Sequence, residues 1–462
     1  MMNFQAGDYL IIGLYAAIVL YTGFVVARRE KKGEGAEEFI LAGRTITLPL
    51  FVGTLVATWY GNILGVGEFV FTSGVVAWVC FGLPYYVAAG VFAWFIAGRI
   101  RDSEALTIPD QMSRGYGPGA GMTASVIVLI ITIPAAYILM LGALVKMFTG
   151  WSLAASIIVG ALISLAYLFT GGFRADVLTN SVQFVLMFLG FGALLFFSMQ
   201  QFGPAGLMLD QLPEQHLEFF GGESWQYVLS WYIISLQTFV DPSFHQRCAA
   251  AKSASTARRG IIISILFWMV FDSLTLLTGL YAKAYIDVSS PLMAYPALGE
   301  AVLPVAWKGL FVTALLAAVM STLDSYAFIS AATIGHDILR PLRKNARPES
   351  LTRIGLVITS IFGVALAIIL PSAVDIIYKT ASIAVPGLLI PLTFSFSRRW
   401  HLGARHAGII MYSASGASAI WTLGQIYSEN IAGGIALFDM FEPMLPGIAI
   451  SMVLGAIWIR KR

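Results

Sequence analysis

The chain contains little charge. Asp, Glu, Lys and Arg make up 11% of its 462 residues, whereas a soluble domain carries about 25%. Hydrophobic residues make up 58%, and the mean hydropathy is +0.80. A soluble protein of this length needs a larger polar surface than this composition supplies. The composition therefore excludes an ordinary soluble protein and predicts one whose outer surface contacts a lipid bilayer.

Cysteine and histidine are also scarce, with two and five copies. Cys80 lies in an apolar run and Cys248 lies among basic residues, so we expect no disulfide framework. The histidines are scattered, and no nucleophile motif or phosphate-binding loop is present. The formal net charge of +3 is not gathered in one basic patch. We therefore expect neither an enzyme nor a protein that binds nucleic acid.

Apolar runs long enough to cross about 30 Å of hydrocarbon recur along the whole chain. The loops between them are too short for a soluble domain, so we expect a single transmembrane domain over 1–462. An odd number of spans would place the two termini on opposite sides. The runs predict thirteen membrane-spanning helices, at 9–27, 47–72, 75–98, 121–148, 151–170, 176–200, 225–243, 260–284, 303–335, 353–371, 374–394, 405–427 and 443–460.

Basic residues concentrate in every second loop. With the N-terminus outside, the inner loops hold the clusters within 28–44, 99–114, 247–259 and 340–353, whereas the outer loop 201–224 is acidic. Cytoplasmic loops of membrane proteins carry such an excess of Lys and Arg. We therefore expect a multi-pass protein of the plasma membrane, the inner membrane in a bacterium, with the N-terminus outside and the C-terminus in the cytoplasm.

Two predicted spans contain residues that interrupt a helix. The second has four glycines around Trp59, Tyr60 and Asn62, and the seventh ends at Asp241-Pro242. Unwound backbone within a membrane is tolerated where it lines a cavity or binds an ion. The alternative for the second span is close helix packing through small residues. Interrupted spans separated by five indicate an inverted five-helix repeat, as found in transporters.

Few carboxylates lie at membrane depth. Glu68, Asp272 and Asp324 each cost roughly 2.5–3.5 kcal/mol on insertion scales, so each is a functional candidate. Glu68 is near the outer end, where water can reach it, and for Asp272 we favour a structural pairing. Asp324 follows Ser321 and Thr322 in a polar cluster, for which a purely structural role is a weaker interpretation.

The polar cluster has the spacing of an ion site. Ala318, Ser321 and Thr322 stand at i, i+3 and i+4 and share one helix face. Two hydroxyls and a carbonyl form a partial oxygen shell, and hard cations such as Na⁺ prefer oxygen ligands. The alternative is that both hydroxyls donate back to their own helix.

Four segments together resemble the sodium/solute symporter family in their order and spacing. They extend from about 39 to 340, and the thirteen-span topology extends the likeness towards both ends. The segments are Phe39–Arg44, Gly171–Ala175 continued by Thr179–Gln183, Gln246-Arg247 continued by Ala250–Ser253 and Ala257–Arg259, and Ala317–Ser325 continued by His336-Asp337-Ile338.

This resemblance implies an all-α membrane protein with a LeuT-type core of ten helices. The core comprises a first repeat at 46–200 and an inverted repeat at 225–394, with a peripheral helix at 9–27 before it and two at 405–460 after it. It also implies Na⁺-coupled import by alternating access. The family's main Na⁺ site transfers to the carbonyls of Ala57, Tyr60 and Ala318 and the hydroxyls of Ser321 and Thr322.

One position departs from the family pattern. Where the family usually has Asp in the fifth core helix, this chain has Asn180. Our hypothesis is that Asp324 supplies this inner carboxylate and that Asp324, Ser325 and Asn180 form a second ion or exit site. The alternative is that Asp324 titrates and the protein couples transport to H⁺. The number of Na⁺ ions per cycle stays open.

The solute is expected near the membrane midplane, between the interrupted helices. The aromatic candidates could each simply pack, and the solute could be an amino acid, an amine or a monocarboxylate. A transporter-like sensor is a further alternative, although the chain ends at Arg462, just after the last span, and we expect no signalling domain. The sequence predicts no oligomeric state. Candidates by position are Trp59, Asn62, Glu68, Trp231, Tyr232 and Gln237.

Overall fold

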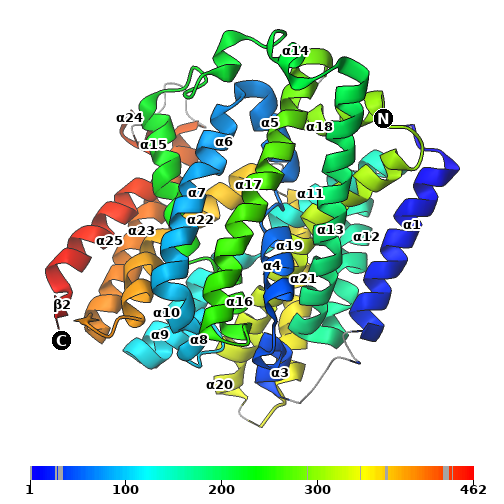
Figure 1. The fold of residues 1–462 in the computed structure, drawn as a ribbon. Coiled ribbons are helices and arrows are strands. Elements are labelled where there is room, and N and C mark those ends of the chain that lie inside the picture. Colours follow the sequence, from blue (N-terminus) through cyan, green and yellow to red (C-terminus); the bar gives the residue numbers. More distant parts are fainter. Residues whose placement is uncertain are drawn as a thin grey trace.

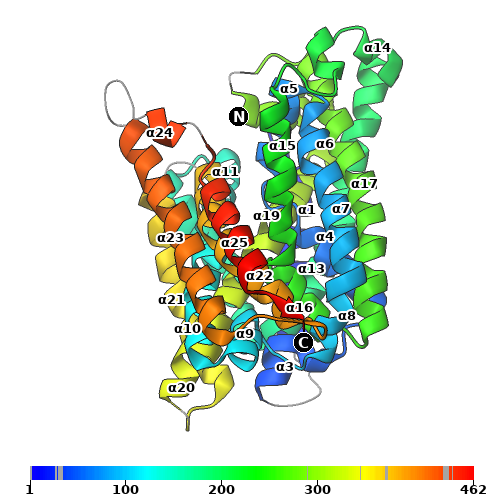
Figure 2. The same cartoon turned by 90° about the vertical axis from the view of Figure 1, so that its left-hand side faces the viewer.

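The protein is a bundle of helices (Figure 1 and Figure 2). The computed structural model describes residues 3–26, 29, 35–288, 290–343, 345–369, 373–429, 436–439 and 441–461. The inner end of the first predicted span, most of the basic cluster after it, and the residues where the tenth span ends lie outside the described residues. The upper and lower ends of the bundle are those of the view in Figure 1.

The first half of the chain crosses the bundle repeatedly. α1 continues into the π-helical turn η1, and α13 is kinked at Gly172, which has φ 56° and ψ −149°. The elements are α1 (Ala6–Tyr21), η1 (Thr22–Val26), α3 (Ala36–Leu41), η2 (Ala42–Arg44), α4 (Leu48–Thr58), α5 (Ile63–Ser73), α6 (Val76–Phe81), α7 (Leu83–Phe92), η3 (Ala93–Ala97), α8 (Gly98–Asp102), α9 (Ile108–Tyr116), α10 (Pro118–Thr132), α11 (Ala135–Thr149), α12 (Leu153–Ala166) and α13 (Leu168–Phe202).

The second half adds the remaining helices and one short antiparallel strand pair. β1 pairs with β2 through Trp400 opposite Lys461. The elements are α14 (Ala205–Leu209), η4 (Glu214–Leu217), α15 (Trp225–Ile234), η5 (Ser235–Phe239), α16 (Pro242–Ala250), α17 (Ala254–Tyr285), η6 (Pro291–Met293), α18 (Ala294–Val302), α19 (Trp307–Ala332), η7 (Thr333–Leu339), α20 (Arg340–Leu342), α21 (Pro348–Ile369), α22 (Ala373–Ser395), β1 (Trp400–His401), α23 (Ala404–Glu429), α24 (Ala436–Asp439), α25 (Met444–Trp458) and β2 (Arg460–Lys461).

Each predicted span corresponds to helix in the structure. Within the described residues, eight helices are long and apolar enough to cross a membrane alone, and the bent pair α4 and α5 makes a ninth. α12 and α25 are apolar but shorter, and α15 and α23 do not meet the same test of length and hydropathy. Since these four still align with predicted spans, the structure agrees with the expected multi-span helical fold.

Both predicted interruptions are present. α4 and α5 meet at an angle of 58° across residues 59–62. α15 tightens into the 3₁₀ turn η5, and the chain leaves helical geometry at Val240 and Asp241 before α16 begins at Pro242. Glycine at 61 and proline at 242 favour these breaks because glycine relaxes the backbone and proline cannot donate a helix hydrogen bond.

α19 is the most enclosed long helix of the bundle. It packs against α13, α21, α1, α11 and α4, and its central residues are buried from Phe311 to Ser325. The break between α4 and α5 therefore lies beside a helix that is itself shielded from the surroundings.

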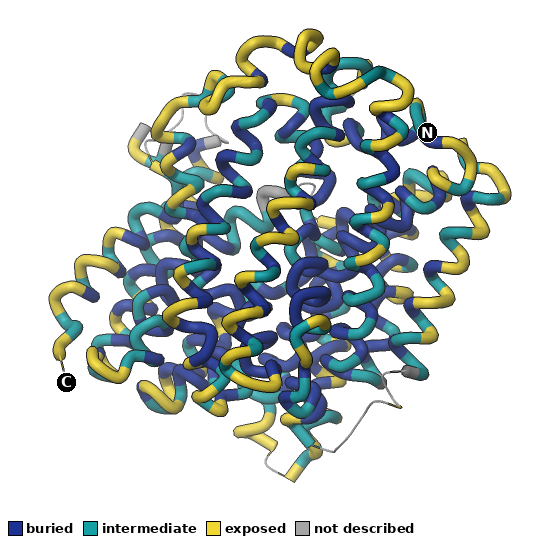
Figure 3. The backbone as a smooth tube through the Cα atoms, in the orientation of Figure 1, coloured by how far each residue is buried: buried dark blue, intermediate teal, exposed yellow. Residues whose placement is uncertain are grey.

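The outer surface of the bundle is apolar. Figure 3 shows buried residues along the axis and exposed residues on the outward faces of the helices. Exposed large hydrophobic side chains include Leu10, Trp94, Ile369 and Leu423, each more than 60% exposed. Apolar side chains spread over many helices are typical of a surface that contacts lipid.

The two termini lie towards opposite ends of the bundle (Figure 1). The N-terminus is near the upper end, together with α14 and α18, and the C-terminus is in the lower half, above α3 and α20. This arrangement is the one expected for an odd number of spans. Which end faces the cytoplasm stays a prediction.

Candidate functional site

The break between α4 and α5 brings backbone carbonyls against the hydroxyl pair of α19. Ser321 Oγ donates to Ala57 O at 2.8 Å and to Ala318 O at 3.0 Å. Thr322 Oγ1 donates to Thr58 O at 2.8 Å and lies 3.3 Å from Ala318 O. The hydroxyls therefore do more than bond back to their own helix. They join the end of α4 to α19.

Four of the five predicted Na⁺ ligands thus gather in one place: Ala57, Ala318, Ser321 and Thr322. The carbonyl of Tyr60 accepts from the Ile63 amide at 3.1 Å, which begins α5. The Thr58 carbonyl, absent from the predicted set, is instead in contact with Thr322. All these candidate ligand atoms for a cation are oxygens, and they belong to buried residues. This donor set fits a hard monovalent cation such as Na⁺.

Gly61 is the residue that allows this close approach. A Cβ atom built on it would lie 2.6 Å from both Cβ and Oγ1 of Thr322. Any larger residue would push the break away from α19. The glycine therefore allows the helix break to approach Thr322 closely as well as loosening the helix.

A buried polar network lies next to these hydroxyls, on the side of the lower end. It comprises Thr54, Thr58, Asp176, Asn180, Arg247 and Ser325, all less than 5% exposed. Arg247 Nη2 lies 3.3 Å from Asp176 Oδ2, in an ion pair whose side chains are both 0% exposed. Ser325 Oγ donates to Asp176 Oδ1 at 2.8 Å, and Asn180 Nδ2 is 3.2 Å from Ser325 Oγ.

Two residues of this network were not expected there. Sequence reasoning placed Arg247 in a basic inner loop, but α16 carries it into the protein interior. Asp176 was not singled out, because it stands at the start of a predicted span, next to Arg174. α13 begins at Leu168 instead, so Asp176 and Asn180 lie one turn apart inside the bundle. Their i, i+4 spacing was the signal that could have found Asp176.

Asp324 faces a different set of residues from Ser325 and Asn180. Its two oxygens accept hydrogen bonds from the hydroxyls of Ser164 and Tyr167. In the described contacts, the carboxylate beside Asn180 and Ser325 is therefore that of Asp176. The predicted grouping of Asp324, Ser325 and Asn180 is not brought together as one cluster.

A cavity of about 200 Å³ opens beside the helix break, and we call it the central cavity. Its walls come from both interrupted helices and from α6, α7, α17, α19 and α22. Aromatic side chains dominate it. Its lining residues include Thr58, Trp59, Tyr60, Asn62, Trp78, Phe81, Tyr85, Tyr137, Trp231, Gln237, Asp241, Asp272, Thr322, Tyr326 and Tyr378.

The structure separates the predicted solute ligands. Trp59, Asn62, Trp231 and Gln237 line the central cavity, whereas Glu68 and Tyr232 are not among its lining residues. Tyr232 is 37% exposed.

Sequence reasoning missed most of the remaining wall, including Tyr85, Tyr137, Tyr326 and Tyr378. It named Asp272 only as a paired carboxylate. That pairing is present, since Tyr60 and Tyr86 both donate to it. Asp272 nevertheless also lines the central cavity.

Comparison with known families agrees with this geometry. A model of the sodium:solute symporter family matches residues 39–394, from α3 to α22. The chain belongs to the sodium:solute symporter family. Its function is therefore solute transport across a membrane and not catalysis, and the resemblance of the four sequence segments is confirmed.

Known transporters resemble this symporter over most of their lengths. The sodium/proline symporter of Escherichia coli is 26% identical over 77% of this chain and 75% of its own. The sodium/pantothenate symporter of the same organism is 24% identical over 96% of this chain and 95% of its own. The high-affinity choline transporter 1 of Drosophila melanogaster is 24% identical over 78% of this chain and 62% of its own.

Solved structures confirm the fold of the symporter. A Na⁺-coupled sialic acid symporter superposes with a TM-score of 0.81, at 14% identity over the whole of both chains. MhsT in complex with L-phenylalanine superposes with a TM-score of 0.53, at 12% identity over 87% of this chain and 97% of its own. The predicted LeuT-type helical architecture is therefore present.

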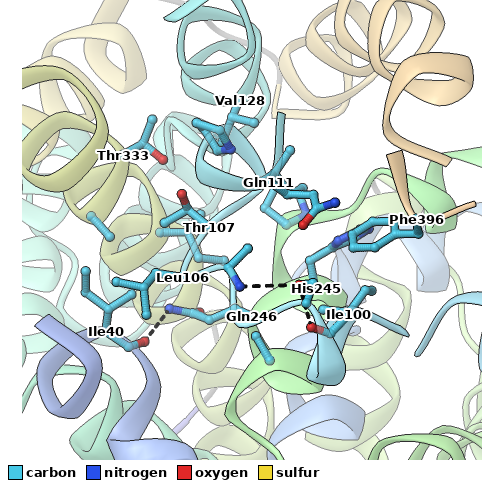
Figure 4. Close-up of a pocket in the computed structure, with 18 residues that line it drawn as sticks. Ile40, Ile100, Leu106, Thr107, Gln111, Val128, His245, Gln246, Thr333 and Phe396 are labelled. Atoms are coloured by element: carbon cyan, nitrogen blue, oxygen red, sulfur yellow. Dashed lines mark hydrogen bonds between the residues drawn. The ribbon is translucent and has the colours of Figure 1, made fainter. Parts of the chain in front are cut away.

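The symporter has a second, much smaller cavity towards the lower end, of about 30 Å³ (Figure 4). His245 and Gln246 of α16 point towards it, opposite Thr107 and Gln111. The Gln246 amide donates to Ile40 O at 3.1 Å. Asp241 and Ser243 line the central cavity, and Pro242 and His245 line this lower one. The first turn of α16 therefore separates the two cavities.

Proposed function

We propose that this symporter uses the Na⁺ gradient to import a small polar organic solute by alternating access. The observation that carries the proposal is the contact of the Ser321 and Thr322 hydroxyls with carbonyls at the end of α4. The names of the relatives support Na⁺ as the coupling ion. In this proposal the N-terminus is outside, the C-terminus is cytoplasmic, and the repeats span 46–200 and 225–394.

The ion would be held by the carbonyls of Ala57, Tyr60 and Ala318 and the hydroxyls of Ser321 and Thr322. Both hydroxyls now donate to carbonyls, at 2.8 Å. A cation at this site would bind the lone pairs of both hydroxyl oxygens and the oxygens of the carbonyls that they now contact. Each hydroxyl hydrogen would then have to point in another direction. Ion binding therefore replaces a direct bond between α4 and α19 with a bond through the ion, and this changes how the two helices are joined.

Solute and ion share residues, which offers a physical basis for coupling. Thr58, Tyr60 and Thr322 line the central cavity and also belong to, or adjoin, the proposed ion site. A solute in the cavity would contact the same turn that the ion orders. Binding of either the ion or the solute would then order this turn and lower the free-energy cost of binding the other. This is the requirement for positive coupling.

We also propose that Asp176, and not Asp324, is the carboxylate nearest the inner side of the ion site. Its partner Arg247 already supplies a positive charge, at 3.3 Å. A second Na⁺ at this position would compete with the guanidinium, so we propose one Na⁺ per cycle. The dependence of uptake on Na⁺ concentration tests this, since one ion gives a hyperbolic curve and two give a sigmoidal one.

A single ion is sufficient for strong accumulation. Moving one positive charge through about 100 mV yields about 2.3 kcal/mol. A tenfold Na⁺ gradient adds about 1.4 kcal/mol. Together they allow a neutral solute to be concentrated on the order of several hundredfold.

The Na⁺ site is tested by the double variant Ser321→Ala/Thr322→Ala. In purified protein, thermal stabilisation by NaCl relative to KCl is expected to disappear. The matched control is Thr313→Ala on the same helix, because the Thr313 hydroxyl is buried and donates to Leu310 O within α19. Full Na⁺ dependence in the double variant would contradict the site assignment.

The H⁺-coupled alternative rests on Asp324, which is fully buried and accepts only neutral donors in the described contacts. Uptake into proteoliposomes separates the two ions. Uptake that persists when K⁺ replaces Na⁺, and that follows a pH gradient, would favour H⁺. Solute binding without any net uptake would favour the sensor alternative.

A further inference from the structure

The charged groups among the described lining residues of the central cavity are acidic. Among its described lining residues are Asp241 and Asp272, and none of them is Lys, Arg or His. We propose that the solute carries a positively charged nitrogen, held between the aromatic rings of the cavity and the carboxylate of Asp272. The inference rests on the proposed function, and it narrows the solute to amines, quaternary ammonium compounds and zwitterions.

Asp272 has neutral partners only. Its Oδ1 accepts from Tyr60 Oη at 2.8 Å, and its Oδ2 accepts from Tyr86 Oη. No salt bridge to Asp272 is found in the described part of the chain. A carboxylate at membrane depth with only phenol donors is costly to ionise. A cation in the cavity would offset this cost, whereas an anionic solute would increase it.

Asp241 differs from Asp272, although both line the cavity. Its Oδ1 caps α16 by accepting from the amides of Ser243 at 2.8 Å and Phe244 at 3.2 Å, and its Oδ2 accepts from Tyr326 Oη at 2.7 Å. The N-terminus of α16 therefore already stabilises its charge. Asp241 adds negative potential to the cavity, and Asp272 is the carboxylate that lacks compensation.

Aromatic rings surround the same space from several helices. Trp59 and Tyr85 lie 5.2 Å apart in an edge-to-face pair, and Phe81 and Trp231 lie 4.6 Å apart in another. Electron-rich ring faces attract ammonium groups, and such rings are the usual means of binding quaternary nitrogen. An aromatic cage together with one uncompensated carboxylate is complementary to a cationic nitrogen. Its described lining residues offer an anionic group no cationic side chain.

A structural role for Asp272 is the competing explanation. With Tyr60 beside the helix break and Tyr86 on α7, Asp272 could simply join α17 to its neighbours. That role predicts a loss of stability on substitution but no preference among solutes. Solute specificity is therefore the measurement that separates the two explanations.

The experiment is a thermal-shift panel on purified full-length protein in saturating NaCl. The probes are choline, L-proline and glycine betaine, which carry a positive nitrogen, and pantothenate and D-glucose, which do not. We expect stabilisation by at least one of the first three. In the Asp272→Asn variant we expect the Kd of the stabilising probe to rise about ten- to hundredfold. The control Asp210→Asn, on the outer loop, is expected to bind like the wild type.

Several results would overturn the proposal. These are stabilisation by pantothenate or glucose instead of the nitrogen cations, no stabilisation by any of the five probes, or unchanged affinity in Asp272→Asn. If that variant does not fold, the panel on wild-type protein still decides, and Asp272→Glu tests whether a restored carboxylate rescues binding. A missing Na⁺ shift without solute would count against the coupling ion, and leave this inference standing.

Discussion

Removing the guanidinium of Arg247 is expected to destabilise the protein strongly, and Arg247→Met is the substitution that shows it. Methionine has a similar length and no charge. Arg247 now contacts Asp176, Thr54, Thr58 and Ser325 in a fully buried site. The variant leaves the Asp176 carboxylate in place without its cation.

The charge is expected to matter far more than the hydrogen bonds. Side-chain hydrogen bonds between membrane helices average about 0.6 kcal/mol, so the hydroxyls of Thr54, Thr58 and Ser325 together are expected to account for about 2 kcal/mol. Leaving one member of a buried ion pair without its partner costs about 3–5 kcal/mol. Asp176→Asn/Arg247→Met removes both charges, so it should recover most of that cost and be more stable than Arg247→Met alone.

The assay is unfolding of purified protein in detergent, by heat and by titration with a denaturing surfactant. Wild type, both single variants and the double variant form a double-mutant cycle. Arg114→Met is the matched control, because Arg114 is half exposed and its pair with Asp110 spans a single helix turn. Such a surface pair contributes less than about 1 kcal/mol.

Two outcomes would refute the reasoning. One is that Arg247→Met is as stable as Arg114→Met, which would mean that the buried charge of Asp176 needs no cation. The other is that the double variant is no more stable than Arg247→Met, which would mean that packing and hydrogen bonds, and not charge, dominate this network.

The remaining predictions concern three other places. Gly61→Ala should weaken Na⁺-dependent stabilisation, because the added Cβ would lie 2.6 Å from Thr322; Gly192→Ala, with open space around it, is the control, and equal Na⁺ shifts in both would contradict this. Asp324→Asn should retain Na⁺-dependent uptake, since its carboxyl faces Ser164; loss of Na⁺ dependence would restore Asp324 as an ion ligand. Burial lowers the pKa of His216 in η4, so the neutral imidazole is favoured in the folded protein. Its contribution to stability is complete above about pH 6.5 and declines as pH falls below it. Protection against hydrogen exchange in 205–222, corrected for the intrinsic pH dependence of exchange, should therefore fall on acidification, and unchanged protection would contradict this.

The sequence was most informative where membrane burial is expensive. Hydroxyls at 321 and 322 and the glycines around residue 61 stand out because lipid-facing helices have little use for them. The structure brings these residues together, as their spacing predicts. Polar and flexible residues at membrane depth are rare enough that each carries information by itself.

The burial of Asp176 and Arg247 could not be predicted in the same way. Both lie near the ends of predicted spans, where charged residues normally face water and the head groups. Their burial depends on where α13 begins and on how α16 turns into the bundle, and neither follows from hydropathy. The cavity aromatics are a similar case, because Tyr85, Tyr137 and Tyr326 come from three helices whose rotation the sequence does not specify.

The contacts on the lower side of the proposed ion site suggest a use for the broken helix in the proposed coupling. Within an intact helix the Thr58 carbonyl would accept from the amide four residues later, but α4 ends at Thr58, so its carbonyl accepts from Thr322 Oγ1 at 2.8 Å. The hydroxyl of the same threonine accepts from Arg247 Nη2 at 2.6 Å. One residue therefore joins the ion site on α19 to α16, the helix between the two cavities. A displacement of α16 that opened the lower cavity would therefore also move Thr58, and with it the carbonyl that contacts Thr322 in the proposed ion site.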